Sequence, residues 1–190
     1  MGLGILGWRE LDAAHRRWIV VNALAVTAVI NTVLNAAIAW ISVRGEHTVP
    51  LWSLPLVGRP STVTDTVGTL FFLPLITTLL CTSGVRRELR AGRLEPLPGP
   101  GPGWTGRLTG GRLRRGLVLG GLCTVVLSPL AVALLVGIDF GSVSRTEFVV
   151  YKAVFCVLLG AVVTPIIAVR AMADPPPVEP AVALDSTLRY

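Results

Sequence analysis

Two asparagines, Asn31 and Asn35, stand one helical turn apart inside an apolar stretch that runs from Ile19 to Ile41. Carboxamides near the middle of a membrane are costly unless they are hydrogen-bonded, so both side chains should face protein or water instead of lipid. They are therefore candidates for the wall of a polar cavity. The alternative is that they belong to a packing seam between helices.

The asparagines are part of a longer stripe in which small or polar residues recur every four positions, on one helix face. This first stripe consists of Ala23, Thr27, Asn31, Asn35 and Ala39. A second stripe in another apolar stretch consists of Gly116, Gly120, Thr124 and Ser128. Small residues let membrane helices approach closely and hydroxyls bond across them, so both stripes predict packing seams of a helical bundle.

Asp65 and Lys152 are ionisable residues close to the expected membrane core. Lys152 lies about 7.5 Å inside its apolar stretch if that stretch is helical. In one interpretation Lys152 extends to the outer headgroups while Asp65 caps its helix. In the other, the two form an ion pair that ties helices together or gates an outer vestibule.

The sequence motifs of catalysis and metal binding are absent from the chain. It has no nucleophile elbow, no phosphate-binding loop and no HExxH motif. Its two histidines, His15 and His47, have neither a cysteine nor a carboxylate pair at metal-ligand spacing. The three cysteines, Cys81, Cys123 and Cys156, lie in apolar stretches and are expected to be free thiols. We therefore expect no enzyme activity, cofactor or metal.

Four apolar stretches must position these residues: 19–41, 66–85, 116–138 and 148–169. Each is close to the length of about 20 residues that a helix needs to cross a bilayer. The composition agrees, since 52% of residues are hydrophobic and 15% charged. The sequence predicts an all-α membrane protein whose four transmembrane helices form two helical hairpins. The first stretch is too long for a signal peptide and is expected to be retained.

The whole formal charge of +6 is concentrated between the second and third stretches. Residues 86–115 contain two glutamates and eight arginines: Arg86, Arg87, Arg90, Arg93, Arg107, Arg112, Arg114 and Arg115. The positive-inside rule places this segment and both termini in the cytoplasm, with the protein in the bacterial inner membrane. Anionic lipid headgroups are the expected partners of the basic segment, and nucleic acid is not.

The predicted organisation follows the chain in five parts: a cytoplasmic segment 1–18, a first hairpin 19–85 with an apolar outer loop 42–62, a basic linker 86–115, a second hairpin 116–170 and a flexible cytoplasmic tail 171–190. Alternating prolines and glycines between Leu97 and Gly103 exclude helix and sheet there. The hairpins run in the same direction, so they are candidates for a parallel internal repeat.

The runs Asn35–Trp40, Val49–Trp52 and Asp65–Thr78 resemble a group of uncharacterised bacterial integral membrane proteins. Some of those proteins carry the label permease. The resemblance covers mainly the first hairpin, and it implies a four-helix membrane architecture without a demonstrated activity.

Two functions remain open at this stage. The first is a small-solute transporter, acting as an oligomer, that uses Asn31, Asn35, Asp65 and Lys152. The second is a non-catalytic accessory or assembly subunit, whose stripes and apolar outer loop dock another membrane protein. The outer loop at 49–58 fits an interfacial segment, a lid or a docking surface.

Overall fold

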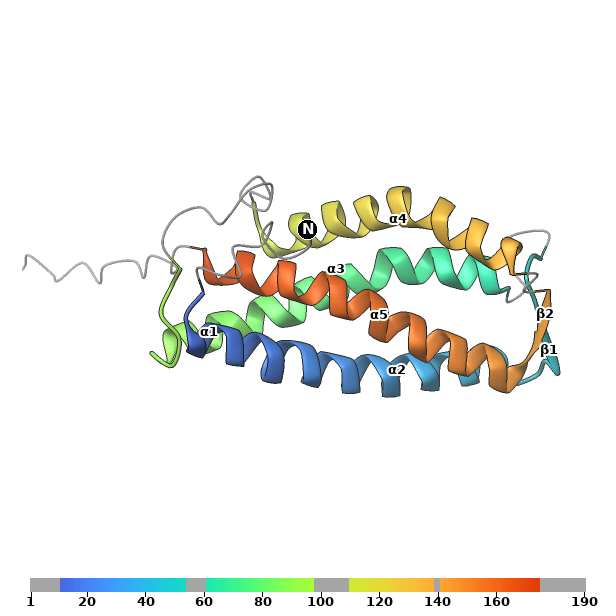
Figure 1. The fold of residues 1–190 in the computed structure, drawn as a ribbon, viewed down its shortest axis with the longest axis horizontal. Coiled ribbons are helices and arrows are strands. Elements are labelled where there is room, and N and C mark those ends of the chain that lie inside the picture. The colour runs from blue at the N-terminus through green and yellow to red at the C-terminus, as the bar shows by residue number, and fades with distance from the viewer. Residues whose placement is uncertain (1–10, 54–60, 98–109, 139–140, 175–190) are drawn as a thin grey trace, which may run out of the picture.

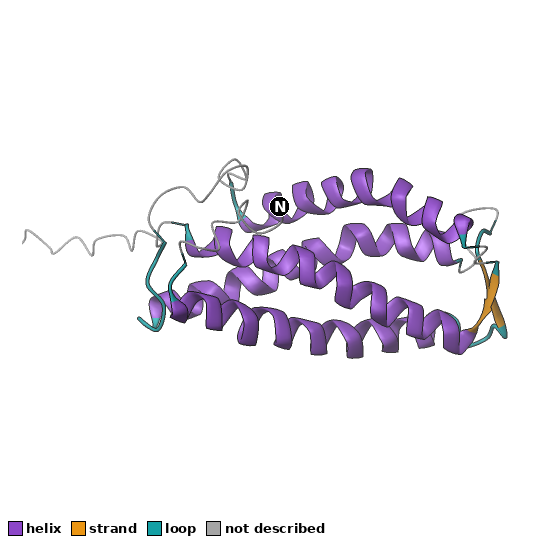
Figure 2. Cartoon of the chain, viewed as in Figure 1, coloured by secondary structure: helices purple, strands orange, loops and turns teal. Residues whose placement is uncertain are grey.

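The computed structural model describes residues 11–53, 61–97, 110–138 and 141–174, and it consists almost wholly of helices (Figures 1 and 2). In chain order the elements are α1 (Ala13–Trp18), the π-helical segment η2 (Ile19–Ala25), α2 (Val26–Ser42), β1 (Thr48–Pro50), α3 (Thr62–Arg90), α4 (Arg112–Gly137), β2 (Ser142–Ser144) and α5 (Arg145–Met172). The long helices run side by side, with the two short strands at one end of the bundle (Figure 1). We call this the ribbon end and the opposite end the arginine end.

Four helices are long and apolar enough to cross a membrane, which confirms the predicted number of spans within the described residues. The first is the continuous run of α1, η2 and α2, which contains 30 residues, and the other three contain 29, 26 and 28. Each exceeds the length of about 20 residues that a bilayer core requires. The chain is therefore built as a polytopic membrane protein.

Capping residues set where α3 and α5 begin at the ribbon end. The Ser61 side chain accepts a hydrogen bond from the Thr64 backbone and so starts α3 four residues before the apolar stretch. Ser144 and Glu147 form a capping box at the start of α5, in which each side chain accepts from the backbone N–H of the other. These caps satisfy N–H groups that a helix end leaves unpaired. They fix the register that brings Lys152 opposite α3.

The helices pack in the order α4, α3, α5, α2, so that α3 and α5 are central. In the most apolar stretch of each helix, 56% of residues in α5 and 39% in α3 are buried by the protein itself. The corresponding values are 17% for α4 and 6% for the first span. The outer helices α2 and α4 therefore offer most of their surface to lipid.

The two predicted hairpins are not confirmed as packed units, nor is the internal repeat. The two spans of each predicted hairpin have at most marginal contact with each other: α2 lies against α5 instead of α3, and α5 lies against α3 and α2 instead of α4. A short loop favours contact between the two spans that it joins, but lipid supplies no hydrophobic force that would hold those two spans together. Close-packing residues decide the neighbours instead.

Residues 19–25 differ from the uniform α-helix that the sequence predicts, because they form a π-helical segment. Ile19 and Ala23 on this segment are buried, while Asn22 is exposed. The residue types of η2 do not account for its π-helical bonding.

The connections at the ribbon end are tied together. β1 and β2 pair antiparallel with Val49 opposite Val143, and the Val49 side chain is fully buried beside Phe148. The Arg145 guanidinium donates to the Glu46 carbonyl oxygen at 2.9 Å and lies 5.2 Å from the centre of the Trp40 ring. Residues 48–50 of the predicted apolar outer loop thus form a strand, and residues 54–60 of that loop lie outside the described residues.

At the arginine end, segments outside the spans are also anchored. The buried His15 ring joins the Asp12 carboxylate and the Glu95 carbonyl oxygen, both at 2.8 Å. Hydrogen bonds from the His15 backbone and side chain lower the pKa of Asp12. The Leu97 backbone N–H donates to a carbonyl at the end of α5. Most of the Pro/Gly linker and the tail beyond residue 174 lie outside the described residues.

Candidate functional site: a cleft beside a buried ion pair

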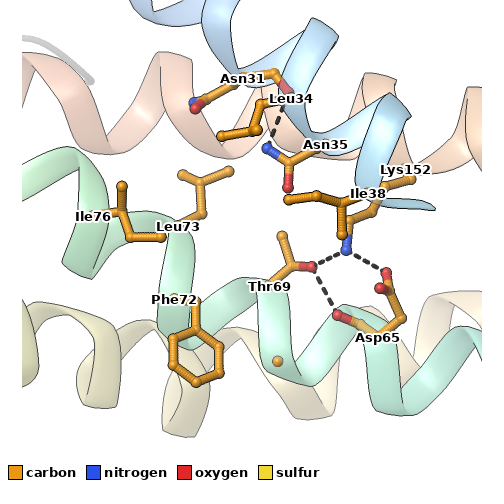
Figure 3. A pocket seen from close by; sticks show the side chains of 11 residues that line it. Asn31, Leu34, Asn35, Ile38, Asp65, Thr69, Phe72, Leu73, Ile76 and Lys152 are labelled. Atoms are coloured by element: carbon orange, nitrogen blue, oxygen red, sulfur yellow. Dashed lines mark hydrogen bonds and ion pairs between the residues drawn. The ribbon is translucent and has the colours of Figure 1, made fainter. Parts of the chain in front are cut away.

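Lys152 of α5 is 4% exposed, and α3 supplies both of its polar partners. Its Nζ donates to Asp65 Oδ2 and to Thr69 Oγ1, each at 2.5 Å (Figure 3). The Thr69 hydroxyl in turn donates to the Asp65 backbone carbonyl at 2.7 Å, so its lone pairs are free to accept from the ammonium group. Asp65 and Thr69 are four residues apart and therefore share one face of α3.

The Lys152 ammonium group lies well inside the bundle. Lys152 and Thr69 are each the eighth residue of their helices, which places both about 10 Å from the ribbon end of the helix. An ammonium group at that depth is strongly destabilising unless a partner neutralises it. Asp65 does not cap α3, since Ser61 has that role. Of the two sequence interpretations, the geometry therefore corresponds to the ion pair.

A cleft of about 330 Å³ adjoins this ion pair. It lies where α2 and α3 have no extensive contact with each other, and Lys152 of α5 contributes to it. Its lining residues are Asn31, Leu34, Asn35, Ile38, Asp65, Gly68, Thr69, Phe72, Leu73, Ile76 and Lys152. The walls are mainly apolar, and Leu34, Ile38 and Phe72 are about half exposed, so the cleft opens on the lipid-facing surface.

The two asparagines take different roles at the cleft. Asn35 Nδ2 donates to the Asn31 backbone carbonyl at 2.9 Å, and the Asn35 side-chain oxygen points into the cleft (Figure 3). The Asn31 side chain turns away from the ion pair, and its buried Nδ2 has no hydrogen-bond partner among the described residues. This Nδ2 faces Gly160 of α5, where an added Cβ would lie 3.1 Å from it. Asn35 thus lines the cleft, whereas Asn31 belongs chiefly to the α2–α5 seam.

The other predicted polar residues lie elsewhere. Thr27 is half-buried on α2, one turn from Asn31, and does not line the cleft. Thr124 and Ser128 are on α4, a helix whose extensive contacts are with α3 alone. The Thr124 hydroxyl donates to the Gly120 carbonyl at 2.8 Å, and the buried Ser128 hydroxyl has no hydrogen-bond partner in the part of the chain that the structure describes. The structure therefore does not bring Thr124 and Ser128 to the cleft.

The second stripe forms the contact between α4 and α3. An added Cβ at Gly120 would lie 2.6 Å from the Phe71 carbonyl oxygen, and one at Gly116 would lie 2.7 Å from Leu75 Cδ1. Only glycine allows the two helix backbones to approach this closely. This seam is occupied by another helix of the same chain.

Sequence reasoning missed two sets of polar contacts. The first is on α3 beside the ion pair, where Thr69 binds Lys152 and the Thr66 hydroxyl lies 2.7 Å from the Tyr151 hydroxyl of α5. The available signal was the position of Thr69 one turn after Asp65. The second set is at the arginine end, where three arginines surround Asp174. Its signal was the spacing of four residues between Arg170 and Asp174.

Comparison of the chain with protein-family models, curated proteins and solved structures finds no match. In the ranges that the structure describes, no group of three or more His, Cys, Asp or Glu side chains could hold a metal ion. The functional argument therefore depends on the cleft, the ion pair and the helix packing.

Proposed function

We propose that this chain is a small-solute transporter of the bacterial inner membrane, and that its cleft between α2 and α3 is the solute site. One observation carries the proposal: a buried lysine, paired with a partly buried carboxylate, borders a ligand-sized cleft. Ionisable residues inside membrane spans are rare and commonly mark substrate pathways. The volume of about 330 Å³ lies within the usual range of small-molecule sites.

The lining suggests an amphipathic solute. An anionic group on the solute would bind Lys152, a donor would bind Asp65 or the Asn35 oxygen, and the hydrocarbon part would contact Leu34 and Phe72. When the anionic group of the solute replaces Asp65 as the partner of Lys152, the ammonium group stays neutralised. Binding therefore avoids the penalty of an unpaired buried charge.

A homo-oligomer would complete the site. The cleft is open at the surface between α2 and α3, so this chain supplies only part of its wall. A second copy placed over the opening would enclose a solute and shield it from lipid. In the orientation that we propose from the positive-inside rule, the ribbon end faces outward and both termini are cytoplasmic.

The pattern of helix neighbours supports a proposed duplication of the two halves. In a duplicated protein α2 would correspond to α4, and α3 would correspond to α5. Under this correspondence the α2–α5 contact is equivalent to the α4–α3 contact, and the α3–α5 contact is equivalent to itself. The strands from the two corresponding loops pair with each other. Parallel repeats about an axis along the membrane normal occur in known transporter folds.

The alternative is a non-catalytic accessory or assembly subunit. Its main support in the sequence was the pair of small-residue stripes, but Gly120 and Asn31 face α3 and α5 of this same chain. A partner would have to bind the apolar outer faces of α2 and α4, which also suit lipid. We therefore favour the transporter.

The first test is native mass spectrometry of the full chain, extracted gently from its host membrane. We expect a homo-oligomer that carries a small-molecule adduct, and Asn35→Leu should reduce the adduct. Asn22→Leu is the matched control, because Asn22 is exposed on η2 and lies outside the cleft. A stoichiometric second protein would instead support the accessory role, and a bare monomer would count against both.

A topology test can accompany it. A cysteine in place of Trp52, which is half exposed, should react with an impermeant thiol reagent added outside the cell. A cysteine in place of the exposed Arg90 should not react. The native cysteines are buried and give little background. The reverse labelling pattern would overturn the proposed orientation.

A further inference from the structure

Three helices bring one arginine each to a single carboxylate at the arginine end. Asp174 lies 2.6 Å from Arg115 of α4, 3.1 Å from Arg170 of α5 and 3.5 Å from Arg86 of α3, measured between side-chain oxygen and nitrogen. The Asp174 side chain is 6% exposed, and those of Arg115 and Arg170 are each 10% exposed. We call these four residues the arginine cluster.

The arginine cluster is short of hydrogen-bond acceptors. Three guanidinium groups face one carboxylate, which leaves two positive charges in excess. Among the described residues, Arg115 Nε and Arg170 Nε are buried and have no hydrogen-bond partner, and Arg170 Nη1 has only the ion-pair contact with Asp174. Buried donors without acceptors are destabilising, and more so when they are charged. The cluster is therefore better suited to a larger anion than to one carboxylate.

We propose that the arginine cluster is a binding site for a phosphate group, and that Asp174 occupies it as an internal anion in this conformation. A phosphate monoester offers three acceptor oxygens and a charge approaching −2. It would neutralise the two excess charges and supply acceptors to the unpartnered guanidinium nitrogens. Arginine is the side chain best matched to phosphate, because its planar fork can donate two parallel hydrogen bonds.

The position of Asp174 allows it to leave. It lies just beyond Ala173, the residue that caps the end of α5, so it can move without unwinding the helix. Between Arg115 and Arg170 there is at present a cavity of only about 10 Å³, bordered by Thr78 and Thr82. That is room for about one water molecule, so a phosphate must displace the carboxylate instead of binding beside it.

The cluster also lies at a depth where phosphate occurs. Arg170 is the third residue from the end of α5, and Arg115 is the fourth residue of α4. Both are thus within about 5 Å of a helix end, close to the headgroup region if the helices cross a bilayer. A phospholipid headgroup and a soluble phosphate compound present the same chemistry to this site.

The test is a titration of delipidated full-length protein in neutral detergent at fixed salt. The probes are short-chain phosphatidic acid, short-chain phosphatidylcholine and inorganic phosphate, with bound ligand counted by native mass spectrometry. We expect phosphatidic acid to bind and Arg115→Gln to weaken it about tenfold, the loss of roughly one charged hydrogen bond. Arg114→Gln, which removes the same charge from an exposed neighbour, should leave the affinity unchanged.

Asp174→Asn separates this proposal from a purely structural role of the carboxylate. Because it removes the internal competitor, it should tighten phosphate binding several-fold, whereas a structural carboxylate would give no gain. If inorganic phosphate displaces phosphatidic acid at comparable concentration, the natural ligand is a soluble phosphate compound. If inorganic phosphate does not displace it, the ligand is a lipid headgroup. Should Arg115→Gln fail to fold, Arg86→Gln with Arg87→Gln as its exposed control makes the same comparison.

Three results would overturn the proposal. The first is an equal loss of affinity in Arg114→Gln and Arg115→Gln, since that indicates diffuse attraction of anions to a basic surface. The second is equal binding of phosphatidic acid by the wild type and Arg115→Gln. The third is an Asp174→Asn variant that binds no better than the wild type.

Discussion

Lys152 faces Asp65 one to one near the ribbon end, whereas three arginines share the carboxylate of Asp174 at the opposite end. Lys152 is about 10 Å inside α5, whereas Arg115 and Arg170 are within about one turn of a helix end. Deep in a bilayer no solvent or headgroup can neutralise an unpaired charge, so the chain must do so itself. Near the headgroups an excess of positive charge is tolerated, because anions are available there.

The two ends also use different helices. α3 and α5 contribute to both, but α2 reaches only the cleft beside the ion pair, and α4 reaches only the arginine cluster. The central helices thus form a common scaffold, while each outer helix completes one site. This division implies that a change in the α3–α4 contact should affect the arginine cluster and spare the cleft.

The largest expected effect comes from breaking the balanced pair. Asp65→Ala leaves the buried Lys152 ammonium without its counter-ion and should lower the free energy of unfolding by about 3 kcal/mol. Lys152→Met should cost less, because the remaining Asp65 carboxylate is 25% exposed and lies in the first turn of α3, near the end of the span, where water can hydrate it. Reversible unfolding in mixed micelles measures both values.

The double variant Asp65→Leu/Lys152→Met is the control for this prediction. It removes both charges and should recover most of the stability that Asp65→Ala loses, since a buried pair is readily replaced by apolar residues. Additive losses in the double variant would show that the two side chains do not stabilise each other.

Removing the shared carboxylate at the arginine end should have a smaller effect. In the absence of anionic lipid, Asp174→Ala should lower the free energy of unfolding by about 2 kcal/mol, because three partly buried arginines then repel one another. Since added salt screens this repulsion, the loss should shrink at high ionic strength. The loss in Asp65→Ala should not shrink, because the ammonium group that it leaves unpaired, that of Lys152, is buried inside the bundle. Equal salt responses in the two variants would remove the distinction between the ends.

The α3–α4 seam gives the next largest effect. Gly120→Ala places a Cβ 2.6 Å from the Phe71 carbonyl oxygen, a backbone atom that cannot rotate away. We expect a loss of about 1–2 kcal/mol from this overpacking. Weaker binding at the arginine cluster should accompany it, because α4 carries Arg115, while the adduct in the cleft should persist.

Gly121→Ala is the matched control, since its Cβ meets nothing within 4 Å. It should be neutral or slightly stabilising, because alanine favours helix over glycine. If Gly120→Ala also left stability unchanged and instead released a separate protein, the accessory role would regain its main support.

The spans could be predicted from the sequence because a long apolar stretch has only one stable solution in a bilayer. Their neighbours could not. Both stripes consist of small residues, and nothing in the stripe of Gly120 indicates whether it faces the preceding or the following helix. The Pro/Gly linker between the second and third spans favoured two hairpins, but the close backbone contact at Phe71 decides the partner. The spacing of residues along one helix identifies a packing face, but it does not identify the helix that packs against that face.

The same limit explains why the ion pair could be proposed from the sequence and the arginine cluster could not. Asp65 and Lys152 stood out because few ionisable residues occur near the apolar core. The arginine cluster was hidden, since Arg115 resembles every other arginine of the basic segment until the helix ends are known. Asp174 was assigned to the tail although it is buried in the structure.

Gly160→Ala addresses the region between the two ends, and its effect should be the smallest. The new Cβ would lie 3.1 Å from Asn31 Nδ2, but that atom is the end of a flexible side chain and can move by a few tenths of an ångström. The loss should stay below about 1 kcal/mol, partly offset by the better helix propensity of alanine. Gly84→Ala, whose Cβ meets nothing within 4 Å, measures the propensity gain alone.

If Gly160→Ala cost as much stability as Gly120→Ala, the Asn31 side chain would be held as rigidly as a backbone. The α2–α5 seam would then be a second fixed contact, and the wall of the cleft could not shift to admit a solute.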